Sequence, residues 1–334
     1  MVSGGARSNQ ATISSPSRSA VPANASASET AAASDRARRP CHVGCPSWRH
    51  YNVGVDRTEI TMTRPLSLAA LTVLELSPPN MVTCAATASF SHVGIRLIPA
   101  TPTEPHYDLI GDTPLVRETE RRLADTGIEV LDVEIFRLKP ETRVADFEAA
   151  IATAARLRAR HLLVAANDDN RSRLIEHFGE FCDLASRYRL SASLEFMPWT
   201  DARDLIEGAQ IVEAVNRDNG GLLIDPFHLS RSRGRITDIA SVPQKRLHFM
   251  QFCDVPTAIP ATMDEILAEA RAERLFPGEG NLDLVALLRA VPPNLPLSVE
   301  VPTHALARTM NATDRAKRAL AATREVLALA EAQA

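Results

Sequence analysis

Four short apolar runs decide the fold of this sequence: SASLEFM at 191–197, GLLID at 221–225, LHFMQFCD at 247–254 and LPLSVEV at 295–301. Each run has the length and composition of a buried strand, and each carries an oxygen-bearing side chain near its end. Stretches with apolar residues three and four positions apart, typical of helices, separate most of them. Strands that alternate with helices in this way form a parallel sheet.

The same alternation extends toward the amino terminus. Eight strands with a helix after nearly every one, over about 270 residues, match the repeat of a (β/α)8 TIM barrel. A doubly wound sheet is the competing α/β fold, but it needs a glycine-rich loop after its first strand, and Ser77-Pro78-Pro79-Asn80 contains no glycine. The sequence therefore predicts a barrel over 64–334. The remaining strands are expected at Ser67–Leu76, His92–Ile98, Glu129–Arg137 and His161–Ala166, and helices at Leu115–Thr126, Val144–Arg160, Ser172–Tyr188, Ala202–Asn216, Leu282–Ala290 and from about Asn311 to Ala334. Asp112-Thr113-Pro114 and Thr200-Asp201 are expected to begin two of these helices.

Composition excludes several classes of protein. The chain has 334 residues, is 45% hydrophobic and 4% aromatic, and carries a net charge of −4. This balance argues against a dedicated nucleic-acid binder, and no uncharged apolar stretch reaches the length of about 18 residues that a membrane span needs. The five cysteines are scattered and odd in number. They are typical of reduced thiols, so a cytoplasmic location is expected.

Residues 1–63 differ from the rest of the chain. Residues 1–61 are rich in Ser, Ala, Arg and Pro without apolar periodicity, and seven arginines against four acidic residues give this part +3 and leave −7 for the remainder. Such a segment cannot bury enough apolar surface to fold, so we expect a disordered, low-complexity tail. An organelle-targeting segment or a start codon assigned too early, with Met62 as the true start, are alternatives. Cys41, His42, Cys45 and His50 fit no standard zinc spacing.

Barrel geometry indicates where the chemistry lies. Active sites of TIM barrels form at the carboxyl ends of the strands. Glu195, Asp225, Gln251 and Glu300 all occupy such positions on the fifth to eighth strands. A single buried acid is normally paired with Arg or Lys, but three carboxylates at one depth would repel each other strongly. A divalent cation resolves this repulsion, and an all-oxygen ligand set suits Mg²⁺, Mn²⁺ or Co²⁺.

These four positions, with the run Asp225-Pro226-Phe227-His228 and the loop Arg274-Leu275-Phe276-Pro277-Gly278-Glu279-Gly280, resemble the xylose isomerase-like TIM barrels. That superfamily contains sugar-phosphate isomerases and epimerases, ketose 3-epimerases, inosose dehydratases and isomerases, and dehydroshikimate dehydratases. The resemblance covers roughly Leu66 to Ala330.

The resemblance implies a role for each matching residue. Glu195, Asp225, Gln251 and Glu300 match the ligands of one divalent cation, and Glu195 and Glu300 also match the acid–base pair. His228 and Arg274 match residues that bind substrate oxygens. The sequence departs from the ketose epimerases at Gln251, where those enzymes often have histidine, whereas dehydroshikimate dehydratases resemble it in having glutamine.

Two further strand-end residues are candidates. Glu134 is a possible substrate contact on the third strand, although Asp132 shares its face and one of the two could be salt-bridged lower in the barrel. Arg96 either binds a substrate anion or neutralises an internal acid, and we favour the second role.

Three functions are compatible with these residues. The first is a metal-dependent isomerase or epimerase of a small sugar, polyol or keto-sugar, which removes a proton next to a carbonyl through a metal-stabilised enediolate. The second is a dehydratase on the same scaffold, acting on an inosose- or dehydroshikimate-like substrate. The third is DNA repair of the endonuclease IV type, which the net charge of −7 and the small number of strand-end histidines disfavour. A carbohydrate-like small molecule is the expected partner, without nucleic acid or membrane, and a homo-oligomer is left open.

Overall fold

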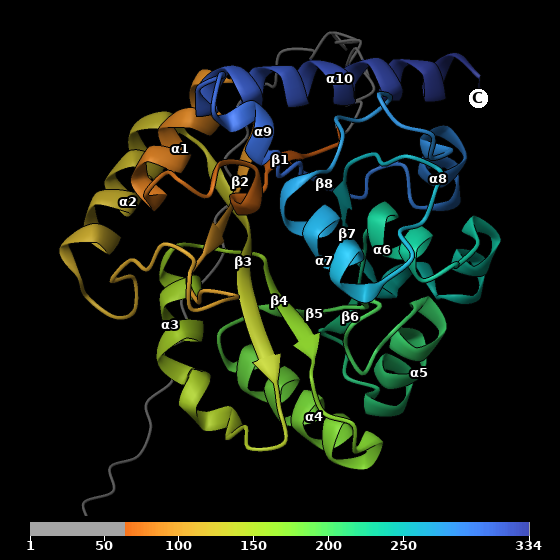
Figure 1. Ribbon diagram of the computed structural model, residues 1–334. Helices are drawn as coiled ribbons and strands as arrows, with labels where there is room; N and C mark the ends of the chain where they lie inside the picture. Colours follow the sequence, from red (N-terminus) through yellow and green to blue (C-terminus); the bar gives the residue numbers. More distant parts are fainter. Residues whose placement is uncertain (1–63, 334) are drawn as a thin grey trace, which may run out of the picture. The chain divides into compact units, whose positions relative to one another are not determined.

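The eight expected strands close into one parallel barrel. The structure, a computed structural model, describes residues 64–333, and within them the strands pair in the order β1-β2-β3-β4-β5-β6-β7-β8, with β1 also pairing with β8 (Figure 1). The fold predicted from the sequence is confirmed. The strands are β1 (Leu66–Leu68), β2 (His92–Arg96), β3 (Glu129–Leu138), β4 (His161–Ala166), β5 (Ser191–Glu195), β6 (Gly220–Ile224), β7 (Leu247–Phe252) and β8 (Leu297–Val299).

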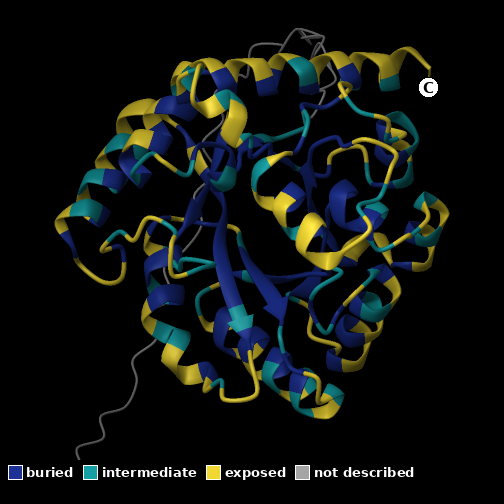
Figure 2. Ribbon diagram, in the orientation of Figure 1, coloured by how far each residue is buried: buried dark blue, intermediate teal, exposed yellow. Residues whose placement is uncertain are grey.

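Helices cover the outside of the barrel, and most of them bury one apolar face. Figure 2 shows the strands buried and the outer helical faces exposed, as the helical spacing of apolar residues predicts. The helices are α1 (Pro78–Thr87), α2 (Pro114–Thr126), α3 (Glu148–Arg156), α4 (Arg171–Arg187), α5 (Leu205–Val215), α6 (Pro226–Arg231), α7 (Met263–Ala272), α8 (Leu284–Ala290), α9 (His304–Ala307) and α10 (Ala312–Ala332), with shorter 3-10 turns at Ala70–Val73, Val144–Phe147, Ile236–Ser241 and Gln244–Arg246.

Strand register determines which side chains share the interior. Glu195 of β5 pairs with Leu223 of β6, and Leu223 pairs with Phe249 of β7. Leu223 and Phe249 belong to a small apolar cluster inside the barrel. Because side chains two positions apart along a strand share a face, Asp225 and Gln251 lie above this apolar cluster, toward the carboxyl ends of β6 and β7.

The first strand is shorter than the sequence predicts. A strand was expected over Ser67–Leu76, but β1 ends at Leu68 and Ala70–Val73 forms a 3-10 turn. The Thr72 hydroxyl donates to the Val299 carbonyl oxygen (2.9 Å) and accepts from the Val301 N–H (2.8 Å), which holds this turn across the end of β8. Most of the segment is buried, and an apolar run of this length does not distinguish a strand from a buried turn.

One of the two expected helix starts is confirmed. Thr113 caps α2, because its hydroxyl accepts the Val116 N–H at 3.1 Å. The second prediction was wrong, because Thr200-Asp201 does not begin the helix expected at Ala202–Asn216. Asp204 caps α5 instead, accepting the Glu207 N–H at 2.8 Å, while the Thr200 hydroxyl donates within its own loop to Met197.

The predictions for residues 1–63, including the tail and its Cys/His group, lie outside the described residues. Within residues 64–333, no helix combines the length and apolar character that crossing a bilayer requires. The expected cytoplasmic location and the homo-oligomer stay predictions.

Candidate active site and metal site

Four neighbouring strands bring the predicted ligands together at the carboxyl end of the barrel. Glu195 is the last residue of β5, Gln251 lies near the end of β7, and Asp225 and Glu300 directly follow β6 and β8. All four residues are at most 4% exposed. Their depth matches the prediction that four polar groups share one buried layer.

His228 joins two of these residues in a compact group. Asp225 begins α6 by accepting the Phe227 N–H at 2.7 Å, and the first turn of that helix turns the His228 ring toward Glu195. The His228 Nε2 atom lies 3.4 Å from Glu195 Oε1 and 3.4 Å from Asp225 Oδ2. One donor atom from each residue lies within 4.8 Å of the others. This is a candidate metal site, with two carboxylates and an imidazole as donors.

Gln251 and Glu300 adjoin this group. The Gln251 amide Nε2 donates to Glu300 Oε1 at 2.9 Å, whereas Gln251 Oε1 is buried and has no hydrogen-bond partner among the described residues. An unsatisfied buried carbonyl oxygen costs free energy, and a cation would satisfy it. The donor set therefore fits a divalent cation.

Arg274 lies between the carboxylates. Its Nη1 atom is 2.8 Å from Asp225 Oδ2 and 2.9 Å from Glu300 Oε2, and its Nε donates to the Ala270 carbonyl oxygen at 3.0 Å. The guanidinium also stacks on the Phe227 ring, 4.7 Å from its centroid. The structure thus places Arg274 in the site, where its charge offsets the repulsion between Asp225 and Glu300.

The two carboxyl groups respond differently to this environment. Burial raises the pKa of Glu300 well above its usual range, and the opposing effect of Arg274 is the smaller one. Burial also acts to raise the pKa of Asp225, but the charges of Arg274 and His228 outweigh it and hold that pKa below its usual range. Glu300 is therefore the group of this pair that holds a proton more readily.

Glu134 and Arg96 form a buried pair next to the site. Arg96 Nη2 lies 3.3 Å from Glu134 Oε2, and Arg96 Nη1 donates to Glu104 Oε2 at 2.8 Å. Burial raises the pKa of Glu134, against the charge of Arg96. Arg96 thus neutralises internal acids, the role that we favoured. Glu134 Oε1 is buried and has no hydrogen-bond partner among the described residues.

The buried carboxyl group of Asp132 is expected to make the stability of the protein depend on pH. Burial, followed by the charge of Glu134, raises the pKa of Asp132 well above its usual range, and the Ser298 hydroxyl donates to its carboxylate at 3.5 Å. A folded-state pKa above the unfolded one means that stability is highest below the unfolded pKa and falls as the pH rises through the folded pKa. Asp132→Asn is therefore expected to raise the free energy of unfolding at pH 8 by about 1–3 kcal/mol, and by less near pH 4.

Urea unfolding at pH 4, 6 and 8 measures this difference, with Asp125→Asn on the exposed end of α2 as the control. A gain from Asp132→Asn that does not grow with pH would contradict the buried-carboxyl account.

The sequence interpretation missed two residues that shape the site. Trp199, in the loop after β5, packs edge-on against the His228 ring, with centroids 5.0 Å apart. Arg137, near the end of β3, was a polar residue at a strand end, a signal that could have identified it. Cys253 lines the site, with its Sγ atom 3.6 Å from Arg274 Nη1. Burial raises the pKa of its thiol, which fits a core residue and not a nucleophile.

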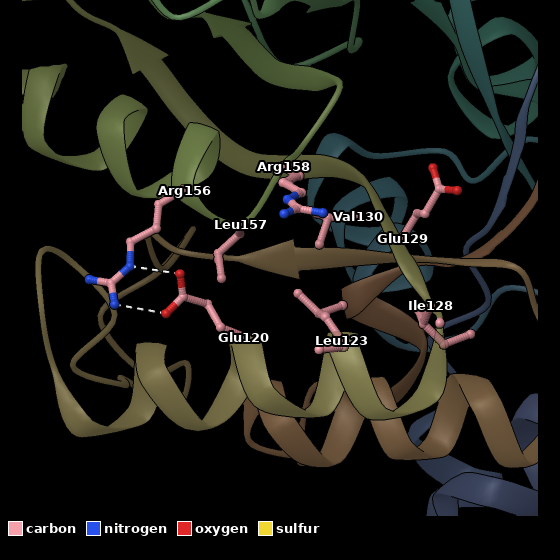
Figure 3. Close-up of a pocket in the computed structure, with 10 residues that line it drawn as sticks. Glu120, Leu123, Ile128, Glu129, Val130, Arg156, Leu157 and Arg158 are labelled. Carbon is pink, nitrogen blue, oxygen red and sulfur yellow. Dashed lines mark hydrogen bonds and ion pairs between the residues drawn. The ribbon is translucent and has the colours of Figure 1, made fainter.

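A pocket of about 550 Å³ lies at the opposite end of the barrel (Figure 3). Leu123 and Leu157 line it, and the Arg156 guanidinium pairs with both oxygens of Glu120, at 2.8 and 2.7 Å. The pocket reaches the first residues of β3, at the amino ends of the strands, where TIM barrels carry stabilising and not catalytic residues.

Comparison with known proteins agrees with this geometry. Residues 85–326 match the family model described as xylose isomerase-like TIM barrel. The chain is 28% identical over 213 residues to a 3-dehydroshikimate dehydratase of Pseudomonas aeruginosa, covering 59% of this chain and 32% of the relative. It is 30% identical over 115 residues to an inosose isomerase of Bacillus subtilis, covering 34% of this chain and 39% of the relative. The matches thus span about a third of the length of these relatives.

Solved structures share the fold at low sequence identity. The IolI protein with a bound zinc atom superposes with a TM-score of 0.65 at 20% identity, covering 78% of this chain and 97% of that one. D-allulose 3-epimerase of Methylomonas sp. in complex with D-allulose gives 0.58 at 17% identity, covering 78% and 96%. Together with the family match over most of the barrel, the closed ring of eight strands shows that this chain belongs to the xylose isomerase-like TIM barrel family.

Proposed function

We propose that this protein is a divalent-metal-dependent isomerase or epimerase of a small sugar, polyol or keto-sugar. The observation that carries the proposal is a pair of buried carboxyl groups at one end of the barrel: Glu195, which belongs to the group of cation-binding donors, and Glu300, which shares Arg274 with Asp225 of that group. Two such groups in one mouth can remove a proton next to a carbonyl and return it at a different place. The inosose isomerases among the relatives support this reaction class.

The residues of the site have different roles in the proposed reaction. Glu195 removes the proton next to the substrate carbonyl, and Glu300, whose pKa is raised by burial, donates one. The His228 ring, held by Asp225 and Trp199, and the free oxygen of Glu134 bind substrate hydroxyl groups.

Glu195, Asp225, Gln251 and Glu300 would hold a divalent cation, which when bound would stabilise negative charge that develops on substrate oxygen. Arg274 neutralises Asp225 and Glu300 and offers its remaining donors to substrate oxygens.

A dehydratase is the second candidate, because it uses the same proton abstraction. The match to the 3-dehydroshikimate dehydratase extends over 213 residues, whereas the match to the inosose isomerase extends over 115. At the position of Gln251, the dehydroshikimate dehydratases resemble this sequence in having glutamine. The DNA-repair alternative needs several strand-end histidines, and among residues 64–333 the metal-ligand group contains one, His228.

Metal content and turnover test the proposal. We expect the purified full-length protein to bind about one Mn²⁺, Mg²⁺ or Co²⁺ ion per chain, measured by mass spectrometry before and after EDTA treatment. EDTA is expected to abolish turnover of a panel of ketoses, inososes and 3-dehydroshikimate, and the added ion to restore it. An isomeric product supports the isomerase, a dehydrated ring supports the second candidate, and full activity in the EDTA-treated protein would reject both.

A further inference from the structure

Arg274 lies in the α7–α8 connection, residues 273–283, which passes across the carboxyl ends of β7 and β8. The Arg274 N–H donates to the Pro302 carbonyl oxygen, just after β8, at 3.1 Å. The next residue, Leu275, exchanges two main-chain hydrogen bonds with Asp254, just after β7, at 2.9 Å each. The main chain therefore holds Arg274 from both sides, between the ends of these two strands.

The Asp254 carboxylate binds main-chain N–H groups of the same connection. Its Oδ1 atom accepts from Val255 at 2.8 Å and from Leu282 at 3.0 Å, and its Oδ2 atom accepts from Gly278 at 3.1 Å. Asp254 is 1% exposed, and no basic side chain among residues 64–333 forms an ion pair with it. A buried carboxylate is costly unless hydrogen bonds replace its hydration, and here main-chain N–H groups replace it. The Asp254 side chain thus ties residues 278–282 to the end of β7.

Gly280 allows the connection to approach this carboxylate closely. A Cβ atom at position 280 would overlap with Asp254 Oδ1 and would lie 2.5 Å from the Val255 carbonyl oxygen. The Asn281 N–H donates to that same carbonyl oxygen at 3.0 Å. Because one of the two obstacles is main chain, a side chain at position 280 would displace the connection from the end of β7.

The contacts of the Arg274 guanidinium depend on this placement. A single atom, Nη1, lies 2.8 Å from Asp225 Oδ2 and 2.9 Å from Glu300 Oε2. A displacement of about 1 Å away from either oxygen would take that contact past hydrogen-bonding distance. A small movement of the connection is therefore enough to separate Arg274 from one of its carboxylate partners.

We propose that Asp254 is a positioning residue of the active site: it fixes the α7–α8 connection on the end of β7 and so keeps the Arg274 guanidinium between its two carboxylate partners. Asp254 acts through the main chain of Leu275 and through the N–H groups of residues 278 and 282. Its effect on turnover rests on the proposed function, in which Arg274 binds substrate oxygens. Its effect on the position of Arg274 does not.

Two variants disturb the same contact from opposite sides. Asp254→Asn keeps the shape of the side chain but replaces one acceptor oxygen with an NH2 group, which cannot accept an N–H. Gly280→Ala leaves the Asp254 carboxylate intact and denies the connection its close approach. The matched control is Asp204→Asn, because Asp204 also accepts a main-chain N–H, that of Glu207 at 2.8 Å, and asparagine caps a helix equally well.

Mn²⁺ binding distinguishes a positioning role from general damage to the site. A guanidinium held at Asp225 and Glu300 opposes the binding of a second cation by the same carboxylates. Arg274→Met is therefore expected to tighten Mn²⁺ binding about 3- to 30-fold. Asp254→Asn and Gly280→Ala are expected to tighten it as well, and neither is expected to add to the gain in the Arg274→Met background. Damage to the ligands themselves would weaken Mn²⁺ binding instead.

Kinetics and urea unfolding complete the test. Asp254→Asn is expected to lower kcat/KM about 10- to 100-fold in the wild type and less than about threefold in the Arg274→Met background, while Asp204→Asn changes it less than about twofold. In the EDTA-treated protein, Asp254→Asn is expected to shift the urea midpoint at most about half as far in the Arg274→Met background as in the wild type.

The urea cycle needs neither metal nor turnover, so it separates this inference from the proposed function. If no Mn²⁺ binds and no substrate reacts, the proposed function fails, and smaller midpoint shifts in the Arg274→Met background still support the role of Asp254. Equal midpoint shifts in the two backgrounds would overturn that role. Weaker Mn²⁺ binding in both Asp254→Asn and Gly280→Ala would overturn it as well.

Discussion

Glu300→Gln is expected to lower kcat by about 10²- to 10⁴-fold, the usual contribution of a positioned acid–base group. The substitution keeps the shape of the side chain and one oxygen able to bind a cation, but it removes the proton that the raised pKa of Glu300 makes available. Metal affinity is expected to fall less than in Asp225→Asn, because Asp225 belongs to the compact group with Glu195 and His228.

Steady-state kinetics and metal titration of both variants measure the two effects. Glu141→Gln is the matched control, since that side chain is 74% exposed and pairs with Lys139 at 4.0 Å. Near-normal turnover by Glu300→Gln would show that the mechanism with two glutamates is wrong.

Arg274→Met is expected to lower the free energy of unfolding of the EDTA-treated protein by about 3–5 kcal/mol. The substitution leaves Asp225 and Glu300 buried without their shared partner, and both side chains are at most 4% exposed. A bound divalent cation supplies positive charge at the same carboxylates, so saturating Mn²⁺ is expected to recover more stability in the variant than in the wild type.

Arg318→Met is the matched control for Arg274→Met. Arg318 also stacks on a phenylalanine, Phe276, at 4.7 Å, and pairs with a carboxylate, Glu279, but its side chain is 45% exposed. Surface pairs of this kind contribute about 0–1 kcal/mol. Urea unfolding of both variants, with and without Mn²⁺, measures the loss in free energy of unfolding. Equal losses in the two variants would show that Arg274 does not offset a buried charge.

The sequence predicted the barrel because its signal is repeated eight times. Apolar strand runs and helical spacing recur along the chain, so an error in one element, such as the overlong first strand, does not change the count. That error arose because a buried strand and a buried turn both appear in the sequence as a run of apolar residues. Thr72, which holds the turn, forms its hydrogen bonds with residues more than two hundred positions away.

The sequence predicted which polar residues gather at the carboxyl ends of the strands, but not the contacts that they make there. Strand-end positions identified Glu195, Asp225, Gln251 and Glu300, because the fold brings all strand ends to one face. The position of Arg274 between Asp225 and Glu300 depends on where the loop after α7 crosses the mouth, and sequence spacing does not encode that crossing. The compact group of His228 with Glu195 and Asp225 likewise depends on the first turn of α6.

Proton exchange with solvent tests the central claim most directly. The metal-replete protein is incubated with each substrate of the panel in D₂O, and NMR records deuterium at the carbon next to the carbonyl. The account predicts that deuterium enters at least one substrate, and that Glu195→Gln and Glu300→Gln each abolish the exchange. A protein that binds its ion and its substrate but exchanges no proton, or exchange that persists without either glutamate, would contradict it.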